Sequence, residues 1–367
     1  MLQSEKKCFT PFSIGKLVIP NRFIRSATFE NLEDKDFMPS PELFNMTKKI
    51  AYGECGLIIP GFVFPLESEK SLMAWAPTIK EIHQNTKSKF FFQLCHRGIK
   101  SFPETTKDGI PAGASGYLPG TRDLTNSEIE EIIQNFVIAA KNSKKSGADG
   151  IQLHGAHGFL ISAFLSPYMN RRSDKWGGND ENRLRFLYEI ASSIRSILPD
   201  YPVSIKINGD DCIKNDHSGF FGLKPSLCGY YVKKLNDHKL IDMFEISSGI
   251  EHILDTRNIP YGKNKGEPFE YKGFEYFDGY NAPYASVIRR MAPNAVLSIV
   301  GGLRRFVHME ALIENNECDF ISLCRPFIRN PNIVKDFRTE KSKKSDCISC
   351  GGCLFTMRDG PVHCVRN

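Results

Sequence analysis

The chain has 367 residues, of which 41% are hydrophobic and 25% are charged. These proportions are ordinary for a folded globular protein and exclude disorder as its main state. A formal net charge of +6 is too weak over this length to predict a nucleic-acid-binding protein. The length allows about two domains, or one large barrel with insertions.

The sequence also bears on where the protein works. No stretch approaches the roughly 18 apolar residues that a membrane span needs. The N-terminal residues lack the apolar run of a secretory signal. The 11 cysteines are an odd number, which favours reduced thiols over a disulfide framework. We therefore expect a cytoplasmic protein that binds neither a membrane nor a nucleic acid.

Short apolar runs rich in β-branched or aromatic residues predict buried strands. In chain order they cover 22–26, 56–60, 90–94, 151–153, 203–207, 243–246, 296–299 and 320–323. Amphipathic helices are predicted over 127–146, where Thr125 and Glu128 fit a capping box, and over 181–198. Strands that alternate with helices in this way predict an α/β fold, specifically a TIM (β/α)8 barrel.

The chain divides into three predicted regions. They are the barrel over 1–334, a lysine-rich solvated linker over 335–345 and a short cysteine-containing extension over 346–367. Within the barrel, the long connections 95–126, 155–182 and 247–283 each follow a strand. We expect them over the C-terminal mouth, where such barrels keep their chemistry.

Polar residues follow several of the predicted strands. His154 and His157 come directly after the strand at 151–153. Such a pair can bind a metal, as in a barrel hydrolase, donate to a carbonyl or anionic oxygen, or hydrogen-bond within its own loop. Gln93 and Lys206 lie near other strand ends, where an amide can bind a ring edge and a cation can stabilise an anion. The residues alone leave the three histidine roles open.

The last two predicted strands are followed by a possible phosphate site. Gly301 and Gly302 follow the seventh strand, and Cys324 and Arg325 follow the eighth. Loops at these places in a barrel often hold a phosphate through backbone N–H groups, and glycine permits close approach. We predict a phosphate site here, with glycine turns that bind nothing as the alternative.

Taken together, motifs between residues 9 and 367 resemble the Old Yellow Enzyme group of FMN-dependent NADH:flavin oxidoreductases. The motifs are PNRFIRSAT at 20–28, GLIIPG at 56–61, FQLCH at 92–96, ADGIQLHGAHG at 148–158, FLSP at 164–167, WGG at 176–178, ENR at 181–183 and VGG at 300–302. The Ser-Ala-Thr ending of the first motif and the C-terminal cysteines are most similar to the branch that contains the FMN domains of 2,4-dienoyl-CoA reductase and trimethylamine dehydrogenase.

The resemblance implies an enzyme that takes hydride from NADH or NADPH onto FMN and reduces an electron-poor alkene, quinone or similar small-molecule acceptor at flavin N5. It implies that His154 and His157 hold the substrate carbonyl oxygen. It further implies that Thr28 bonds the flavin C4 carbonyl, Gln93 the pyrimidine edge and Lys206 the N1 and O2 region. The remaining implied contacts are Ala27 against the flavin face, backbone at Gly61, and Gly301, Gly302, Cys324 and Arg325 at the phosphate.

The sequence departs from the family at one catalytic position. Most members carry Tyr two residues after the second histidine, where it protonates the substrate α-carbon, whereas this chain has Phe159. General-acid catalysis must therefore come from elsewhere or be absent. The candidates are Tyr168, Tyr261, Tyr280, His252 and water. A flavin-binding protein with little ene-reductase turnover is the alternative, and we expect Phe159→Tyr to raise turnover on an activated enone.

The C-terminal extension contains the pattern Cys347-x2-Cys350-x2-Cys353-x10-Cys364. Four thiolates at this spacing suit a [4Fe-4S] cluster or a structural zinc. In relatives with further domains similar cysteines hold a cluster, although the final gap here is slightly shorter. A cluster, zinc and an empty thiol site all stay open, as do a homo-oligomer and a separate electron-transfer partner.

Overall fold

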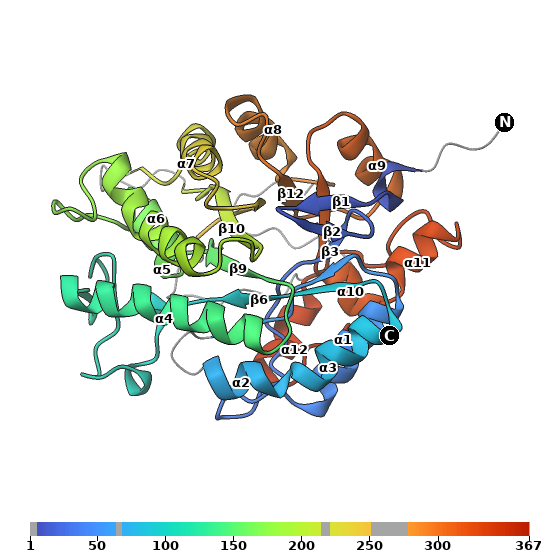
Figure 1. The fold of residues 1–367 in the computed structure, drawn as a ribbon, viewed down its shortest axis with the longest axis horizontal. Helices are drawn as coiled ribbons and strands as arrows, with labels where there is room; N and C mark the ends of the chain where they lie inside the picture. Colours follow the sequence, from blue (N-terminus) through green and yellow to red (C-terminus); the bar gives the residue numbers. More distant parts are fainter. Residues whose placement is uncertain (1–5, 64–67, 214–220, 251–277, 367) are drawn as a thin grey trace.

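The computed structural model describes residues 6–63, 68–213, 221–250 and 278–366. Within these ranges a closed ring of parallel strands confirms the predicted TIM barrel, with helices around it (Figure 1). The ring runs through β3 (Phe23–Arg25), β4 (Leu57–Ile58), β6 (Lys89–Leu94), β9 (Gly150–Gly155), β10 (Val203–Asp210), β11 (Met243–Ser248), β12 (Leu297–Val300) and β13 (Phe320–Leu323). Pairing of β4 with β6 closes it, and β5 (Phe62–Val63) extends the edge of β6.

The helices outside the ring bury one apolar face each, as amphipathic periodicity requires. They are α1 (Pro41–Tyr52), α2 (Ser68–Ala74), α3 (Ala76–Asn85), α4 (Asn126–Lys145), α6 (Asp180–Ile197), α7 (Pro225–Asp237), α8 (Ala282–Met291), α9 (Phe306–Glu314) and α11 (Ile333–Arg338). The capping box of Thr125 and Glu128 starts α4 as predicted. Asn179 caps α6, so both predicted helices are confirmed within a residue or two of the expected bounds.

A hairpin seals one end of the barrel. Strands β1 (Phe12–Ile14) and β2 (Leu17–Ile19) pair antiparallel, and Gly15 takes the positive φ of +57° that their tight turn needs. Ile14 and Ile19 belong to a buried cluster with side chains from the barrel strands, including Phe91 and Met243. Because this apolar cluster fills the end where the strands begin, the described residues leave the opposite, C-terminal mouth as the place for a ligand to bind.

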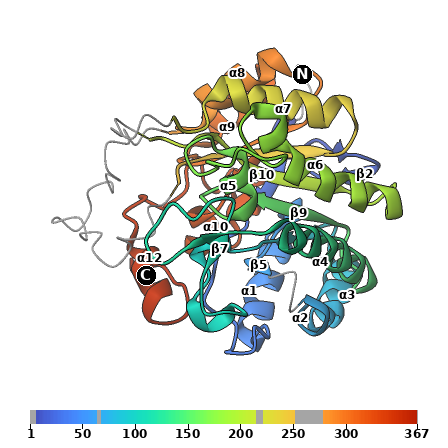
Figure 2. The same cartoon turned by 90° about the vertical axis from the view of Figure 1, so that its left-hand side faces the viewer.

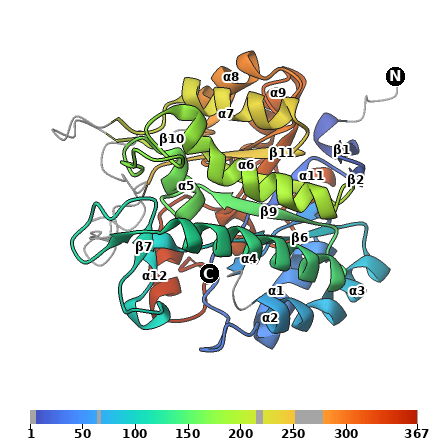
Figure 3. The ribbon, with the colours of Figure 1, turned by 60° about the vertical axis from the view of Figure 1, so that its left-hand side comes forward.

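Several short elements lie in the loops around the C-terminal mouth. They are β7 (Ala112–Gly113), β8 (Arg122–Asp123), α5 (Leu160–Leu165), α10 (Arg325–Arg329), α12 (Gly352–Asp359) and the 3-10 turns Gly98–Lys100 and Pro103–Thr105, while a further turn, Lys7–Phe9, precedes the hairpin. The cysteine-containing segment with α12 lies beside β7 in both side views (Figures 2 and 3). It is held by Asn31, whose Nδ2 donates to Met357 O at 3.0 Å and Gly360 O at 3.2 Å.

The lysine-rich segment 335–345 is partly helical and packed on the barrel. The boundaries of the three predicted regions stay a prediction. Helix α11 extends into it as far as Arg338, and Phe337 in that helix is buried. Further on, Phe306 N donates to Lys343 O at 3.0 Å and Ser345 N to Arg304 O at 2.8 Å. The segment is therefore bonded to the barrel while its lysine side chains face water. Among the described helices, none is long and apolar enough to cross a bilayer.

Candidate functional site

A chain of polar side chains crosses the barrel interior at one level. Gln93 Nε2 donates to Gln152 Oε1 at 2.7 Å, and Gln152 Nε2 donates to Glu245 Oε2 at 2.8 Å. The same Glu245 oxygen lies 3.6 Å from Lys206 Nζ. Strand register explains this meeting, because Gln93 lies opposite Gln152, and Lys206 lies opposite both His154 and Glu245. Two residues predicted from the sequence, Gln93 and Lys206, are thus joined through two that were not.

Lys206 also reaches the end of β3. Its Nζ donates to Ser26 Oγ at 2.8 Å and to Ala27 O at 3.1 Å. Its buried partner Glu245 has one oxygen, Oε1, without a hydrogen-bond partner among the described residues. Buried polar atoms in folded proteins are normally satisfied, so an unpaired oxygen in this network fits a site that a polar ligand completes.

The histidine pair lies at the mouth end of β9. The two rings are perpendicular, with centroids 5.4 Å apart. The backbone N–H of Ala156 donates to His154 Nδ1 at 3.4 Å, so the neutral ring carries its proton on Nε2. His157 Nε2 lies 2.7 Å from Ser247 Oγ. The backbone of His157 adopts a left-handed φ of 60°, and its N–H donates to Asn208 Oδ1 at 3.2 Å.

Burial keeps both imidazoles neutral. Desolvation, followed by the positive charges of Lys206 and Lys100, lowers the pKa of His157 to about 3. The same desolvation, together with His157 and these two cations, lowers the pKa of His154 well below its ordinary value. Because a neutral imidazole offers one N–H donor, the pair is suited to donating hydrogen bonds to an oxygen atom rather than to carrying positive charge.

Aromatic rings form the wall beside the histidines. Phe159 packs against His154 with ring centroids 4.5 Å apart, and Phe62 lies 5.3 Å from Phe159 and 6.1 Å from His154. Phe29 continues the wall at 6.0 Å from Phe62. A flat conjugated substrate bound under the histidines would therefore meet apolar surface on this side.

The expected proton donors lie in different places. Tyr168 is 9% exposed and packs edge-on against Tyr117 with centroids 5.9 Å apart. Tyr280 faces Gly301, where an added Cβ would lie only 2.7 Å from the tyrosine ring. Tyr261 and His252 lie outside the described residues.

The predicted phosphate loop has a backbone that requires glycine. Gly301 and Gly302 have φ values of +123° and +72°, in the region that side chains rarely adopt. Thr28 Oγ1, from the loop after β3, lies 2.9 Å from Cys324 Sγ, which brings the ends of β3 and β13 together. Gly61 N donates to Glu30 Oε2 at 3.0 Å, so the N–H of Gly61 is already engaged. The phosphate contacts themselves stay a prediction.

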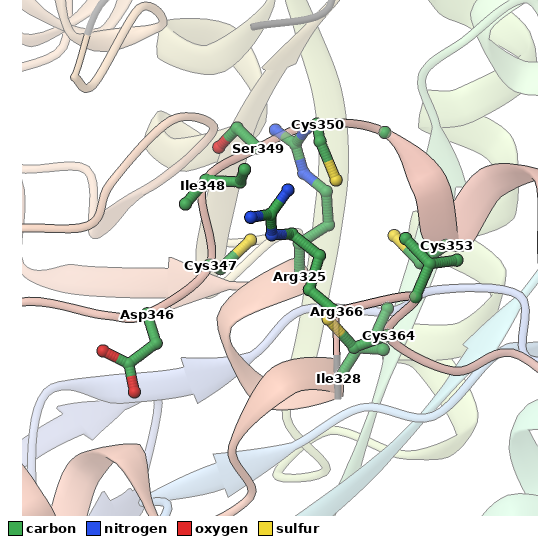
Figure 4. Close-up of a pocket in the computed structure, with 12 residues that line it drawn as sticks. Arg325, Ile328, Asp346, Cys347, Ile348, Ser349, Cys350, Cys353, Cys364 and Arg366 are labelled. Carbon is green, nitrogen blue, oxygen red and sulfur yellow. The ribbon is translucent and has the colours of Figure 1, made fainter. Parts of the chain in front are cut away.

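Arg325 and the four C-terminal cysteines line one pocket. Cys347, Cys350, Cys353 and Cys364 surround it, and the Arg325 side chain extends between them (Figure 4). Burial raises the pKa of Cys353 to about 12, and burial also raises the pKa of Cys347. Within the described ranges, no three Cys, His, Asp or Glu side chains are close enough to hold a single metal ion. Four thiols around one pocket are, however, the donor set of an iron–sulfur cluster, which binds each thiolate through a separate iron atom.

Several residues of the site were not predicted from the sequence, although the sequence pattern does point to some of them. Glu245 interrupts the apolar run of β11 and Gln152 that of β9, and a polar residue inside a buried strand needs a partner. Ser247 and Asn208 gave no such signal, because only the observed register brings them to His157.

We predict that His157, whose pKa burial lowers to about 3, stays neutral from about pH 8 down to about pH 5, and that His154, whose pKa burial also lowers well below its ordinary value, does not titrate in the ordinary histidine range. The ring-proton NMR signals should keep constant chemical shifts, assigned through His154→Gln and His157→Gln. Free imidazole in the same tube supplies the reference that titrates. A sigmoidal shift with its midpoint near about pH 6.5 on either ring would contradict the burial argument.

Comparison with known proteins agrees with the resemblance drawn from the sequence motifs. Residues 7–344 match the NADH:flavin oxidoreductase / NADH oxidase family. The chain is 31% identical over 368 residues to an NADH oxidase of Thermoanaerobacter brockii, covering 94% of this chain and 53% of the relative. It is 30% identical over 344 residues to an NADPH dehydrogenase of Geobacillus sp. (strain WCH70), covering 89% and 92% respectively. The chain thus spans about half the length of the first relative and nearly all of the second.

Solved structures share the fold at lower identity. A 2-naphthoyl-CoA reductase complex has a TM-score of 0.81 at 23% identity over 99% of this chain and 57% of its own. Histamine dehydrogenase from Rhizobium sp. 4-9 has a TM-score of 0.80 at 24% identity, covering 98% of this chain and 52% of its own. Morphinone reductase has a TM-score of 0.72 at 20% identity, covering 95% of this chain and 94% of its own. With the match over residues 7–344, the resemblance drawn from the motifs is confirmed: the chain belongs to the NADH:flavin oxidoreductase / NADH oxidase family.

Proposed function

We propose that this protein is an FMN-dependent oxidoreductase that takes hydride from NADH or NADPH and passes it to an electron-poor alkene, quinone or similar small-molecule acceptor. The observation that carries the proposal is the polar network beside two neutral histidines at the C-terminal mouth of the barrel. The names of the relatives, NADH oxidase and NADPH dehydrogenase, support the nicotinamide donor.

The proposed cofactor contacts use groups that already meet at the strand ends. Lys206 supplies a fixed cation for the N1 and O2 edge of FMN, and Gln93 supplies an amide for its pyrimidine edge. Thr28 contributes a hydroxyl and Ala27 a small side chain against the ring. The phosphate is assigned to Gly301, Gly302, Cys324 and Arg325, and a backbone contact to Gly61. FMN bound in this way supplies the hydride chemistry that amino-acid side chains lack.

The proposed substrate contacts lie above that position. His154 and His157 donate hydrogen bonds to a carbonyl or phenol oxygen, and a donor aimed at that oxygen favours negative charge developing there. The aromatic wall of Phe62 and Phe159 excludes water from one side of the conjugated system. Because neither imidazole is charged, the pair accepts a neutral enone and a phenol equally well.

The first test is the absorbance spectrum of anaerobically purified protein before and after addition of NADH or NADPH. Flavin bands that are bleached by one of the nucleotides are expected, and they would identify the electron donor. A colourless protein that FMN cannot reconstitute would overturn the proposal and return the histidines to consideration as metal ligands.

The histidine assignment has its own test. His154→Ala combined with His157→Ala should weaken binding of a phenol, followed as a change in the flavin spectrum, by about tenfold or more while FMN stays bound, because about 1.4 kcal/mol of hydrogen bonding is lost. His238→Ala is the control, since His238 is exposed at the C-terminal end of α7. Loss of FMN from the double variant alone would place the pair in cofactor binding instead.

A second candidate function is electron transfer through a C-terminal [4Fe-4S] cluster to a separate protein. The supporting observation is that Cys324 connects the two sites. Its Sγ lies 2.9 Å from Thr28 Oγ1, and the next residue, Arg325, lines the pocket of the four C-terminal cysteines. A cluster at the cysteine pocket would therefore lie next to the proposed flavin position, which is the arrangement that electron transfer needs.

Iron, acid-labile sulfide and zinc analysis of protein purified from anaerobic cells tests this candidate. We expect about four iron atoms and four sulfides per chain, with absorbance beyond the flavin bands that disappears in Cys350→Ser. Cys228→Ser is the control, because Cys228 is buried in α7. One zinc without iron would identify a structural site, and absence of both metals would exclude the electron-transfer function.

A further inference from the structure

We propose that Lys100 is the proton donor that replaces the phenol missing at position 159. The proposal rests on the proposed ene reduction and assigns a residue to the step for which the sequence had no donor. In this assignment the Lys100 ammonium protonates the α-carbon of the substrate after hydride has reached the β-carbon.

The position of the Lys100 ammonium is the first support. Its Nζ lies 5.0 Å from the centroid of the Phe159 ring, so the cation stands over the ring that replaces the usual tyrosine. The same Nζ donates to His157 O at 2.6 Å. Both contacts are with the segment that carries the two histidines. The ammonium is therefore held against the loop that connects the histidines to Phe159.

The local backbone explains why the side chain reaches this point. Lys100 ends the 3-10 turn Gly98–Lys100, which follows β6. Gly98 has a φ of +60°, and a Cβ there would lie 3.2 Å from Leu160 in α5, so the turn packs closely on that helix. Lys100 Cε then lies 3.5 Å from the place where Gly158 would carry a Cβ. The lysine stem thus passes along Gly158 towards the next residue, Phe159.

Electrostatic coupling is the second support. The positive charge of Lys100 is among the causes that lower the pKa of both His154 and His157. A cation that acts on both imidazoles lies near the substrate oxygen they are proposed to hold. The α-carbon is bonded to the carbonyl carbon that bears this oxygen, so the proposal puts it on the same side of the mouth as Lys100.

The other residues considered for this step have less suitable surroundings. Tyr168 packs against Tyr117, and burial raises the pKa of Tyr117 to about 12. Tyr280 lies against Gly301 at the end of β12, on the side proposed for the phosphate. Lys100, by contrast, contacts the segment that carries the histidines and Phe159 twice.

The chemistry balances without another reactant. The alkene gains a hydride at the β-carbon from reduced flavin, and the former π electrons move towards the carbonyl oxygen held by the histidines. A C–H bond then forms at the α-carbon as an N–H bond of Lys100 breaks. The neutral amine takes a proton from water, so the net change is addition of one hydride and one proton to the alkene.

The test compares two acceptors after the flavin has been reduced by NAD(P)H. Reduction of 2-cyclohexen-1-one needs a proton on carbon, whereas a quinone takes its protons on oxygen, where water exchanges them freely. Lys100→Met should slow the enone reaction by about 10²- to 10⁴-fold and slow flavin reduction and quinone reduction far less. Lys107→Met is the matched control, because Lys107 lies on the same connection and pairs with Glu131 at the surface.

Two further variants separate proton donation from positioning. Lys100→Arg keeps the positive charge and a donor for His157 O but does not release a proton, so the enone reaction should stay slow. Adding Phe159→Tyr to Lys100→Met should restore it. An enone rate equal to that of the parent protein, an equal loss on quinone, or a double variant that stays slow would each overturn the proposal. Failure of NAD(P)H to reduce the flavin in the parent protein would instead overturn the proposed function.

Discussion

Everything at the mouth depends on keeping a charged pair inside the barrel. Lys206 and Glu245 have side chains that are 4% and 0% exposed, and an isolated charge at that depth would be far too costly to keep. The attraction between the two charges offsets this desolvation cost. Hydrogen bonds also offset it, from Gln152 to Glu245 and from Lys206 to Ser26 Oγ and Ala27 O. Breaking such a pair from one side typically costs about 3–5 kcal/mol. The network therefore fixes the relative heights of β3, β9, β10 and β11 as firmly as the apolar core does.

The polar network of Gln93, Gln152, Glu245 and Lys206 also separates an apolar end of the barrel interior from a polar end. Below it, the β1–β2 hairpin and a cluster that includes Phe91 and Met243 fill the interior with apolar side chains. Above it, the strand ends present amides, a cation and two imidazoles. Among the described residues, the polar groups that can bind a ligand therefore gather at the upper end, and the aromatic wall of Phe62 and Phe159 encloses it on one side. The location of the site thus follows from where the apolar packing stops.

The fold could be predicted because buried strands and amphipathic helices leave periodic patterns, and His154 and His157 could be placed because they follow one of those strands directly. Residues 335–345 were interpreted as a solvated linker because their lysines dominate the composition, whereas α11 extends into them as far as Arg338. The apolar spacing of Val334 and Phe337, both buried in α11, was the better signal. The role of Lys100 could not be read from sequence, since its direction is set by a positive φ at Gly98 and by packing on α5. Side-chain direction in a long loop is a property of tertiary packing.

The same electrostatic arrangement serves both parts of the proposed reaction. Burial, and after it the positive charges of Lys206 and Lys100, lower the pKa of His154 and His157, so the histidines stay neutral donors while the lysines carry the positive charge. Glu245 compensates the charge of Lys206 inside the barrel, 3.6 Å from its Nζ. Negative charge that develops on a flavin edge or on a substrate oxygen would be stabilised by fixed cations and N–H dipoles that need no reorganisation. A site built in this way favours anionic intermediates, and a cation placed beside such an intermediate is also a source of the proton that removes its charge.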